Sequence, residues 1–285
     1  TVSRGGLPGI GTVMMMNGIN SLYANAQPLV VIDGVIMDMQ QSREMLHEGY
    51  FNNMLGNINV NDIESVEILK NGTALYGSKA ANGVILINTK RSKSMATKID
   101  LTINGRYELI PRMPEMMGAE DYRLYTTQLL ADKTPTLGSM KYLNPDPNYY
   151  YYNMYHNNTD WKDQVLENAF SQNYGINVQG GDDVASYNLS VGYSMANSPF
   201  KKNDYSRFSM RLNSDIEVFT GMKVRFDASY SDVDRSLFDD GAPAETRTGV
   251  ITSPTFLALA KSPFLSPYAF DNQGNVSQYL AEADD

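Results

Sequence analysis

The stretch KNGTALYGSKAANGVILINTK, which begins at Lys70, carries a glycine spacing that could cradle a phosphate. Gly72 and Gly77 are separated by four residues, and Ser78 and Lys79 follow. This order is one transposition from G-x-x-x-x-G-K-[ST], the phosphate-binding loop of nucleotide hydrolases. Such a loop needs a long helix after it. Only AANG separates Lys79 from a new apolar run, so we predict a glycine-punctuated hairpin connection and no nucleotide site.

Paired acids and histidines are the other residues that could carry out catalysis. Glu64 and Glu67 fall in a predicted strand, where a spacing of three places two side chains on opposite faces. They therefore cannot flank one glycosidic bond. The two histidines, His47 and His156, are far apart in sequence and lack the spacing of zinc ligands or of a catalytic triad. We predict no enzyme activity, no metal site and no cofactor.

Four acids near residue 235 could supply oxygen ligands for Ca²⁺. They are Asp232, Asp234, Asp239 and Asp240 in the stretch DVDRSLFDDG. Their spacing lacks the register of an EF-hand loop. We interpret them as solvated loop acids.

Composition narrows the class of protein further. The 285 residues carry a formal net charge of −9 and no Cys. The acidic balance, without a basic stripe, argues against a nucleic-acid partner. No apolar run approaches the ~18 residues of a membrane-spanning helix, but a membrane β-barrel has much weaker sequence signals and stays open.

The first ninety or so residues predict a compact α+β unit. QPLVVIDGVIM, from Gln27 to Met37, reads as two strands joined by a tight turn at Asp33-Gly34. SVEILK and GVILINTK read as two more strands, and Asn61 with Glu64 resembles a capping box for one helical turn. The polar run RSKS after Lys90 is a candidate domain boundary. We therefore divide the chain into residues 1–93 and 94–285.

Beyond residue 95 the apolar residues recur with a period of two. Each segment has one apolar and one polar face, as a half-exposed strand requires. The segments are KIDLTINGRYEL, NYGINVQGG, ASYNLSVGYSM, YSRFSMRLNSDIEV and MKVRFDASYS.

The connections between these segments distinguish two architectures. GGDD and FTGM are tight turns, whereas residues 111–171 and 238–285 are long. Tight turns at one rim and long loops at the other are typical of outer-membrane β-barrels. The charges and amides on the polar faces, with Tyr at strand ends, favour this barrel over a soluble antiparallel sandwich. Five strands leave an unpaired edge, so we expect them to be part of a longer polypeptide.

At this point the motifs resemble a known family. PLVVIDGV, NVNDIESVEILKNGTALYGSKAANGVILINTKRSK, TDWKD and GGDDVASYNLSVGY followed by NDYSRFSMRLN are similar to SusC/RagA-type TonB-dependent outer-membrane transporters. The resemblance covers the chain from about Gln27 to Tyr230. Val60, Asn71 and Lys79 stand where the family often has Pro, Asp and Arg.

The resemblance implies a fold and a function. The fold is an α+β plug, residues 1–93, inside an antiparallel transmembrane β-barrel of 22 strands, of which residues 94–285 supply about the first five and their loops. The implied function is TonB-dependent import of an oligosaccharide or peptide. Implied partners are a SusD-like lipoprotein lid, the TonB–ExbB–ExbD complex and a second copy of the transporter–lipoprotein pair. A siderophore or cobalamin receptor and a soluble carbohydrate-binding β protein are the alternatives.

The resemblance also implies which plug residues act in structure or gating. Lys70, Lys79, Lys90 and Arg91 are expected to pair with carboxylates of the barrel, and Tyr76 either packs in the plug core or faces the ligand. The residues carried over from the plug motif are Asp33, Gly34, Asp62, Glu64, Glu67, Lys70, Gly72, Tyr76, Gly77, Lys79, Asn82 and Gly83.

An aromatic loop gives the last candidate site. Tyr149, Tyr150, Tyr151, Tyr152, Tyr155 and Trp161 lie within NPDPNYYYYNMYHNNTDW. Such a surface suits stacking on sugar rings or binding the lipoprotein partner. The alternative, that these rings pack the loop against itself, stays open.

Overall fold

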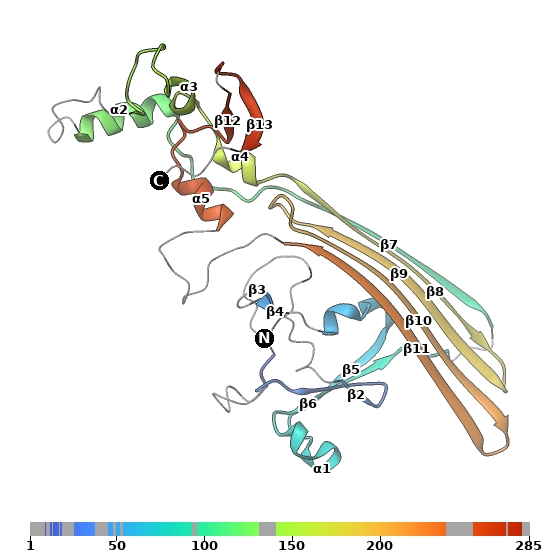
Figure 1. Cartoon of the computed structure of the whole chain (residues 1–285). Coiled ribbons are helices and arrows are strands. Elements are labelled where there is room, and N and C mark those ends of the chain that lie inside the picture. The colour runs from blue at the N-terminus through green and yellow to red at the C-terminus, as the bar shows by residue number, and fades with distance from the viewer. Residues whose placement is uncertain are drawn as a thin grey trace. The chain divides into compact units, whose positions relative to one another are not determined.

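The structure is a computed structural model of the whole chain. It describes residues 9, 12, 14–16, 18, 26–37, 45–47, 50–51, 54–92, 96–130, 141–237, 253–271 and 273–280. The chain divides into two compact units, one of residues 1–109 with 168–238 and one of residues 110–167 with 239–285. The first unit contains a small and a large β-sheet (Figure 1).

The small sheet begins with the predicted hairpin. β1 (Leu29–Ile32) pairs with β2 (Val35–Met37) in antiparallel fashion, and Ile32 faces Val35 across the turn. Asp33 and Gly34 have φ angles of 49° and 87°. Positive φ at both positions is the type I′ turn that matches strand twist, and Asp-Gly is a preferred sequence for it. The hairpin and its turn are confirmed.

The two other predicted strands complete the small sheet, in the order β2-β1-β6-β5. β5 (Ile63–Leu69) is antiparallel to β6 (Val84–Thr89), and β6 is parallel to β1. The connection between β5 and β6 contains α1 (Thr73–Tyr76) and the 3₁₀ turn η3 (Gly77–Ala80), so it is helical and not the simple hairpin connection that we predicted.

The capping box predicted from Asn61 and Glu64 is wrong. The 3₁₀ turn η2 (Val60–Asp62) is capped by Asn59, whose side chain accepts a hydrogen bond from the Asn61 amide at 3.1 Å. Asn61 is therefore inside the turn and not its cap. Glu64 lies in β5, where the pairing with β6 is irregular. The start of β5 so soon after Asp62 leaves no room for the predicted capping box.

Apolar side chains cover both faces of the central strands β1 and β6. Val30, Ile32, Ile85 and Ile87 form a buried cluster on one face. Val31, Ala80 and Val84 form another on the opposite face. Because both faces are buried, the two strands read as continuous apolar runs, as parallel neighbours do. The small sheet thus has its own hydrophobic core.

The large sheet contains the five alternating segments, in the order β11-β10-β9-β8-β7 (Figure 1). All neighbours are antiparallel. Its strands are β7 (Lys98–Glu108), β8 (Ala169–Gly181), β9 (Ala185–Asn197), β10 (Asp204–Phe219) and β11 (Met222–Ser236).

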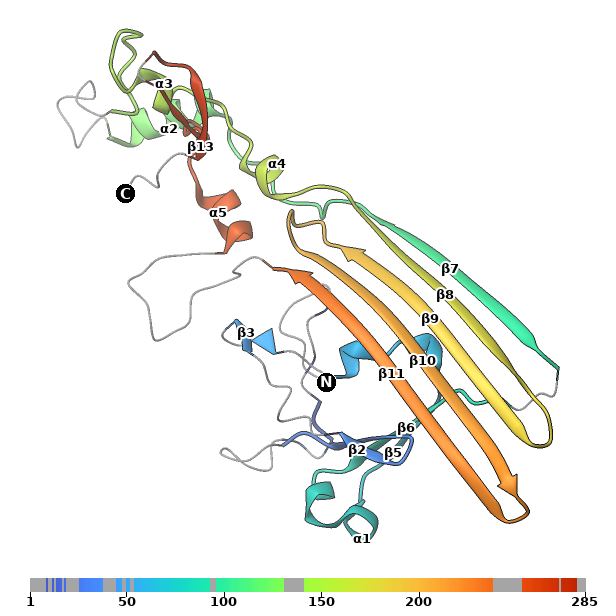
Figure 2. The ribbon, with the colours of Figure 1, turned by 45° about the vertical axis from the view of Figure 1, so that its right-hand side comes forward.

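The register of the large sheet aligns apolar residues across all five strands. Leu101 faces Ile176, Ile176 faces Val191, Val191 faces Met210, and Met210 faces Tyr230. A shift of one residue would turn a whole strand over, so the alternation determines this register. We call this side the apolar face and the opposite side the polar face. Both views place the small sheet on one side of the large sheet (Figures 1 and 2).

The remaining elements are short. The first unit also holds β3 (Met45–His47), β4 (Tyr50–Phe51) and the 3₁₀ turn η1 (Met54–Asn57). The second unit holds α2 (Ala119–Leu130), α3 (Tyr152–Tyr155), α4 (Trp161–Val165), α5 (Pro254–Ala260), β12 (Tyr268–Phe270) and β13 (Val276–Leu280). Among the described residues, no helix has the length and apolar character needed to cross a membrane.

Candidate functional site: the contact between predicted plug and large sheet

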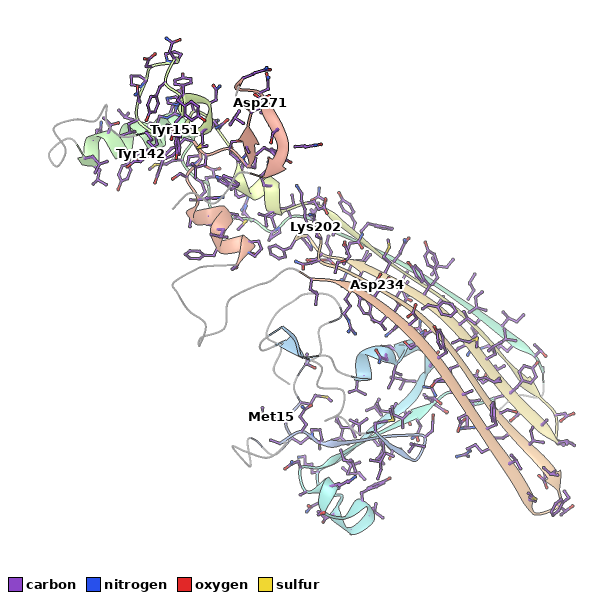
Figure 3. All side chains as sticks on the ribbon, in the orientation of Figure 1. Met15, Tyr142, Tyr151, Lys202, Asp234 and Asp271 are labelled. Carbon is purple, nitrogen blue, oxygen red and sulfur yellow. The ribbon has the colours of Figure 1, made fainter. Side chains whose placement is uncertain are left out.

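The two faces of the large sheet have the opposite burial to that of a soluble sheet. On the polar face Asn188 and Asn213 are each only 1% exposed, and Ser190, Ser209 and Arg207 are also buried. On the apolar face Leu101 is 65% exposed and Phe226 52%. Side chains project from both faces (Figure 3). A sheet that buries its polar side and exposes a wide apolar side fits an apolar surrounding medium.

The predicted plug seats its Asn59–Asp62 turn against a row of small residues. Gly175 of β8 faces Gly192 of β9, which faces Ser209 of β10. A Cβ at Gly192 would collide with the side-chain amide of Asn59, and one at Gly175 would lie 3.4 Å from Nδ2 of Asn61. Glycine inside a strand often marks such a close approach. These two glycines make room for the turn.

Side chains of β10 bind the backbone of the plug just before this turn. Arg207 Nη1 donates to the carbonyl oxygens of Gly56, at 2.6 Å, and Ile58, at 3.0 Å. The Tyr205 hydroxyl donates to the same Gly56 oxygen at 3.2 Å. A cationic donor makes hydrogen bonds stronger than neutral ones. Since the partners are backbone atoms, this grip does not depend on the plug side chains.

A second buried contact holds the end of the plug. Asn213 Nδ2 donates to Thr89 Oγ1 at 2.8 Å and to the Lys90 carbonyl oxygen at 2.9 Å. The Thr89 hydroxyl donates to Asp33 Oδ2 at 2.7 Å, and its amide to Asp33 Oδ1 at 2.9 Å. The turn residue Asp33 is thereby connected through Thr89 to the large sheet.

An ion-pair network lies beside this contact. Arg91 Nη1 is 3.1 Å from Asp215 Oδ1, and its Nη2 pairs with Asp227. Arg225 Nε also reaches Asp215, at 3.2 Å. The two aspartate side chains keep about a third of their surface exposed. Water and salt screen such partly exposed ion pairs, so we expect this network to contribute less to stability than the buried contacts.

Two plug carboxylates share one arginine of the large sheet. Arg211 lies 3.6 Å from Asp33 Oδ2 and 4.0 Å from Asp62 Oδ2. These distances are too long for direct hydrogen bonds. A cavity of about 380 Å³, lined by all three residues, lies between plug and sheet and has room for bridging water. Burial raises the pKa of Asp62, and Arg211 opposes that shift.

The structure places the other motif residues away from this contact. Glu64, Glu67, Lys70 and Lys79 are exposed, and neither lysine pairs with a carboxylate among the described residues. For Lys70 and Lys79 the expected pairing with barrel carboxylates stays a prediction. Arg91 makes it, and the Lys90 main chain contacts Asn213.

The glycines and Tyr76 of the motif shape the plug itself. Gly77 and Gly83 have φ angles of 68° and 91°, which favour glycine, and a Cβ at Gly72 would collide with Val84. Tyr76 packs against the Val31, Ala80 and Val84 cluster. Asn82 is half-buried. A gating role for these residues stays a prediction.

The aromatic loop divides between packing and exposure. In the second unit Tyr155 is buried with Phe264, and Tyr142 and Tyr151 pack against them (Figure 3). Tyr152 stacks on His156, with ring centroids 3.8 Å apart. Trp161 Nε1 donates to the Ser262 carbonyl oxygen at 2.9 Å, and Lys261 lies over its ring.

Tyr149 and Tyr150 both contact the Tyr151 ring edge-to-face. Of the predicted set, Tyr150 is the most open, at 81% exposure. Most of these rings therefore pack the loop, and contact with a ligand or partner stays a prediction.

The residues of the large sheet that bind the plug were missed by the sequence analysis. Arg207, Arg211 and Asn213 stand out in sequence only as polar members of an alternating strand. The signal that could have found the seat is the pair Gly175 and Gly192, because glycine in a strand interior is otherwise unfavourable. Of the four acids that we interpreted as loop residues, Asp232 and Asp234 are exposed but lie in strand β11, so that interpretation is wrong for them. Asp239 and Asp240 lie outside the described residues.

A mixed α/β domain seated on antiparallel strands with an exposed apolar face is the arrangement of a plugged β-barrel receptor. Residues 1–84 match the family described as TonB-dependent Receptor Plug Domain. The chain is 30% identical over 246 residues to the TonB-dependent receptor SusC of Bacteroides thetaiotaomicron, covering 85% of this chain and 22% of that protein. It is 31% identical over 235 residues to TonB-dependent receptor P26 of Formosa agariphila, covering 81% and 22%.

Solved structures agree in fold. The RagAB peptide transporter matches with a TM-score of 0.66 and 23% identity, covering 95% of this chain and 31% of that one. The chain is therefore of the SusC/RagA type of TonB-dependent transporter, and the predicted fold class is confirmed. It spans about a fifth of the length of the curated relatives it matches.

Proposed function

We propose that the protein containing this sequence lies in the outer membrane and imports a large nutrient through a barrel whose plug TonB displaces. The observation that carries the proposal is the burial of the large sheet: its polar face is buried against the plug and its apolar face is exposed. The SusC relative is a TonB-dependent receptor, and the RagAB neighbour is a peptide transporter. These names support an oligosaccharide or a peptide as the substrate class, and no catalytic step is part of the proposal.

The energetics of the contact suit a plug that must move and return. The plug has its own apolar core, so it holds together without the large sheet. Its contact with the sheet includes hydrogen bonds and ion pairs, which water can replace as they break. A dry apolar contact of the same area would resist separation far more strongly.

The proposed partners follow from the same resemblance. TonB, with ExbB and ExbD, supplies the force, and a SusD-like lipoprotein covers the outer opening. The SusC and RagAB neighbours support a lipoprotein partner. The family resemblance also implies a dimer of the transporter–lipoprotein pair. Co-purification of such a lipoprotein from detergent extracts tests this part, and its absence would remove the lid while leaving the barrel.

A disulfide lock tests plug displacement directly. The sequence has no Cys, and the Asn59 side chain contacts Gly192, so the pair Asn59→Cys and Gly192→Cys is placed to cross-link plug and sheet. In the full-length transporter we expect the oxidised double variant to lose TonB-dependent uptake and to regain it under reducing agent. Each single variant is the control. Undiminished uptake by the fully cross-linked protein would overturn displacement at this contact.

Membrane fractionation tests the location. We expect the full-length protein in the outer-membrane fraction, extractable only with detergent, because the apolar face needs a non-aqueous surrounding. Recovery in the soluble fraction would contradict import and favour a soluble carbohydrate-binding protein instead.

A further inference from the structure

One arginine on the polar face has no carboxylate partner among the residues that the structure describes. Arg235 of β11 lies directly opposite Tyr205 of β10, and its guanidinium sits 5.6 Å from the centre of the Tyr205 ring. Its Nε and Nη2 atoms are buried without any hydrogen bond. Among the described residues, no carboxylate lies within ion-pair distance of Arg235.

Arg207 lies on the same face, two residues along β10 from Tyr205. Its Nη1 binds the plug carbonyls, but its Nε is also buried without a hydrogen bond. It too has no carboxylate within ion-pair distance in the described part of the chain. Two cationic side chains on neighbouring strands therefore present unused donors in one place. Buried donors without acceptors are unfavourable, so such a pair attracts an acceptor.

The other half of the polar face shows that this is a local feature. There Arg211 lies near Asp33, Lys223 is 3.6 Å from Glu217, and Arg225 is 3.2 Å from Asp215. The tight Thr220-Gly221 turn joins β10 to β11 at one end of this strand pair. At the other end the polar face carries Tyr205, Arg207 and Ser209 of β10 and Ser231, Val233 and Arg235 of β11, which include two arginines and no acid. Tight turns face the periplasm in outer-membrane barrels, so this positive half faces the arriving substrate.

We propose that Arg235 and Arg207 form a binding site for an oxyanion of the substrate, a carboxylate or a sulfate group, on the outer side of the plug. The inference rests on the proposed import function and specifies the chemistry of the cargo. Guanidinium groups bind such oxyanions through paired, charge-assisted hydrogen bonds. An excess of positive charge on this part of the sheet also attracts anionic ligands.

The plug closes tightly around this site. A Cβ at Gly9 would collide with the Tyr205 ring and lie 3.0 Å from Arg235 Nε, and one at Gly56 would lie 3.9 Å from Arg235 Nη2. The unused donors thus lie beside two glycines, which carry no side-chain acceptor. An anion that draws Arg235 toward the lumen gives its donors the partners that the plug does not supply.

Binding by the purified full-length transporter tests the proposal with four probes. The acidic probes are hexagalacturonate and hexaglutamate, and their neutral counterparts are hexagalactose and hexaglutamine. We expect at least one acidic probe to bind at least ten times more tightly than its neutral counterpart, with a Kd that rises with salt concentration. Which acidic probe is preferred distinguishes a glycan from a peptide as the source of the anion.

Variants locate the effect. Arg235→Gln is expected to remove the preference for the acidic probe, and Arg235→Lys to keep part of it. Arg225→Gln, on the same strand and face but paired with Asp215, is expected to keep it. Heat-modifiable migration on gels checks that each variant is folded, and Arg235→Lys serves if Arg235→Gln does not fold.

The outcomes separate this inference from the import proposal. Equal binding of acidic and neutral probes, no binding of either acidic probe, or equal losses in Arg235→Gln and Arg225→Gln would overturn the oxyanion site. TonB-dependent uptake of a neutral nutrient alone would also overturn it while leaving import intact. Binding of acidic probes by a protein whose uptake is independent of TonB would keep the site and remove the import mechanism.

Discussion

The core of the small sheet and the contact between plug and large sheet are held by different interactions. Val30, Val31 and Val84 are almost fully buried among apolar neighbours. The contact with the large sheet uses arginine, asparagine and carboxylate groups beside a cavity of about 380 Å³. The comparison shows how a domain can keep its own fold while its contact with a neighbour breaks. Water can replace the hydrogen bonds of the contact, but exposing the apolar core to water is unfavourable.

The largest effect is expected in the plug core. Val30→Asp places a carboxylate where no surface is exposed, and we expect it to cost more than about 4 kcal/mol in plug stability. Limited proteolysis of the full-length protein should cleave the plug rapidly and leave the barrel intact. Val35→Asp, at a site 63% exposed, is the matched control. Equal protease resistance in the two variants would show that the plug is not held by its own core.

Removing the Arg207 side chain should have the next largest effect. Arg207→Ala removes the cationic donor from the part-buried carbonyl groups of Gly56 and Ile58, of which only Gly56 keeps another donor, the Tyr205 hydroxyl; we expect this to cost about 2–3 kcal/mol of plug seating. Urea-induced exposure of the plug, followed by proteolysis, measures it. Arg225→Ala, which removes only an exposed ion pair, should shift the midpoint little. A larger shift in Arg225→Ala would reverse the ranking of buried and exposed contacts.

Adding a side chain at Gly192, where the Asn59–Asp62 turn packs against the large sheet, should have a somewhat smaller effect. Gly192→Val forces the Asn59 amide out of its place, and overpacking of this kind costs about 1–3 kcal/mol. The same urea assay should show earlier plug exposure. Gly175→Ala is the graded control, because its Cβ meets Asn61 at the ordinary contact distance of 3.4 Å. If Gly175→Ala lowers the urea midpoint for plug exposure more than Gly192→Val does, Gly192 is not the residue that makes room for the turn.

The pH dependence of seating should be weaker, since it involves one carboxyl group. Burial raises the pKa of Asp62 above the ordinary aspartate value of about 3.9, and Arg211 opposes the shift. The seated state therefore binds a proton more readily than the released state. Seating should strengthen as pH falls through the raised pKa and level off below about 3.9. Urea midpoints between pH 7 and 4 measure this, and Asp62→Asn should flatten the trend.

The smallest effect is expected from the partly exposed ion-pair network of Arg91, Asp215 and Asp227. Arg91→Ala removes the pairs with Asp215 and Asp227, and we expect a loss below about 1 kcal/mol that shrinks further at high salt. Urea midpoints at low and high salt test this. A loss as large as that of Arg207→Ala, independent of salt, would remove the distinction between buried and exposed contacts.

Much of the fold was predictable because the signals are local. The period of two in all five segments of the large sheet, and Asp33-Gly34 between apolar runs, depend only on neighbouring residues. The helical connection after Gly72 was missed because its few residues have no period. The pairing of residues 110–167 with 239–285 was also missed, because Trp161 and Ser262 meet across more than a hundred residues.

By itself the sequence determined which residues form strands, which face of each strand is polar, and which family the chain resembles. Side-chain alternation and turn chemistry are properties of consecutive residues, so they can be read without coordinates. Only the tertiary structure decided that the polar face carries the plug, that Gly192 makes room for Asn59, and that Nε and Nη2 of Arg235 are buried without a hydrogen bond. These facts depend on which distant surfaces meet, and an alternating strand has the same pattern whether its polar face meets water, a plug or a ligand.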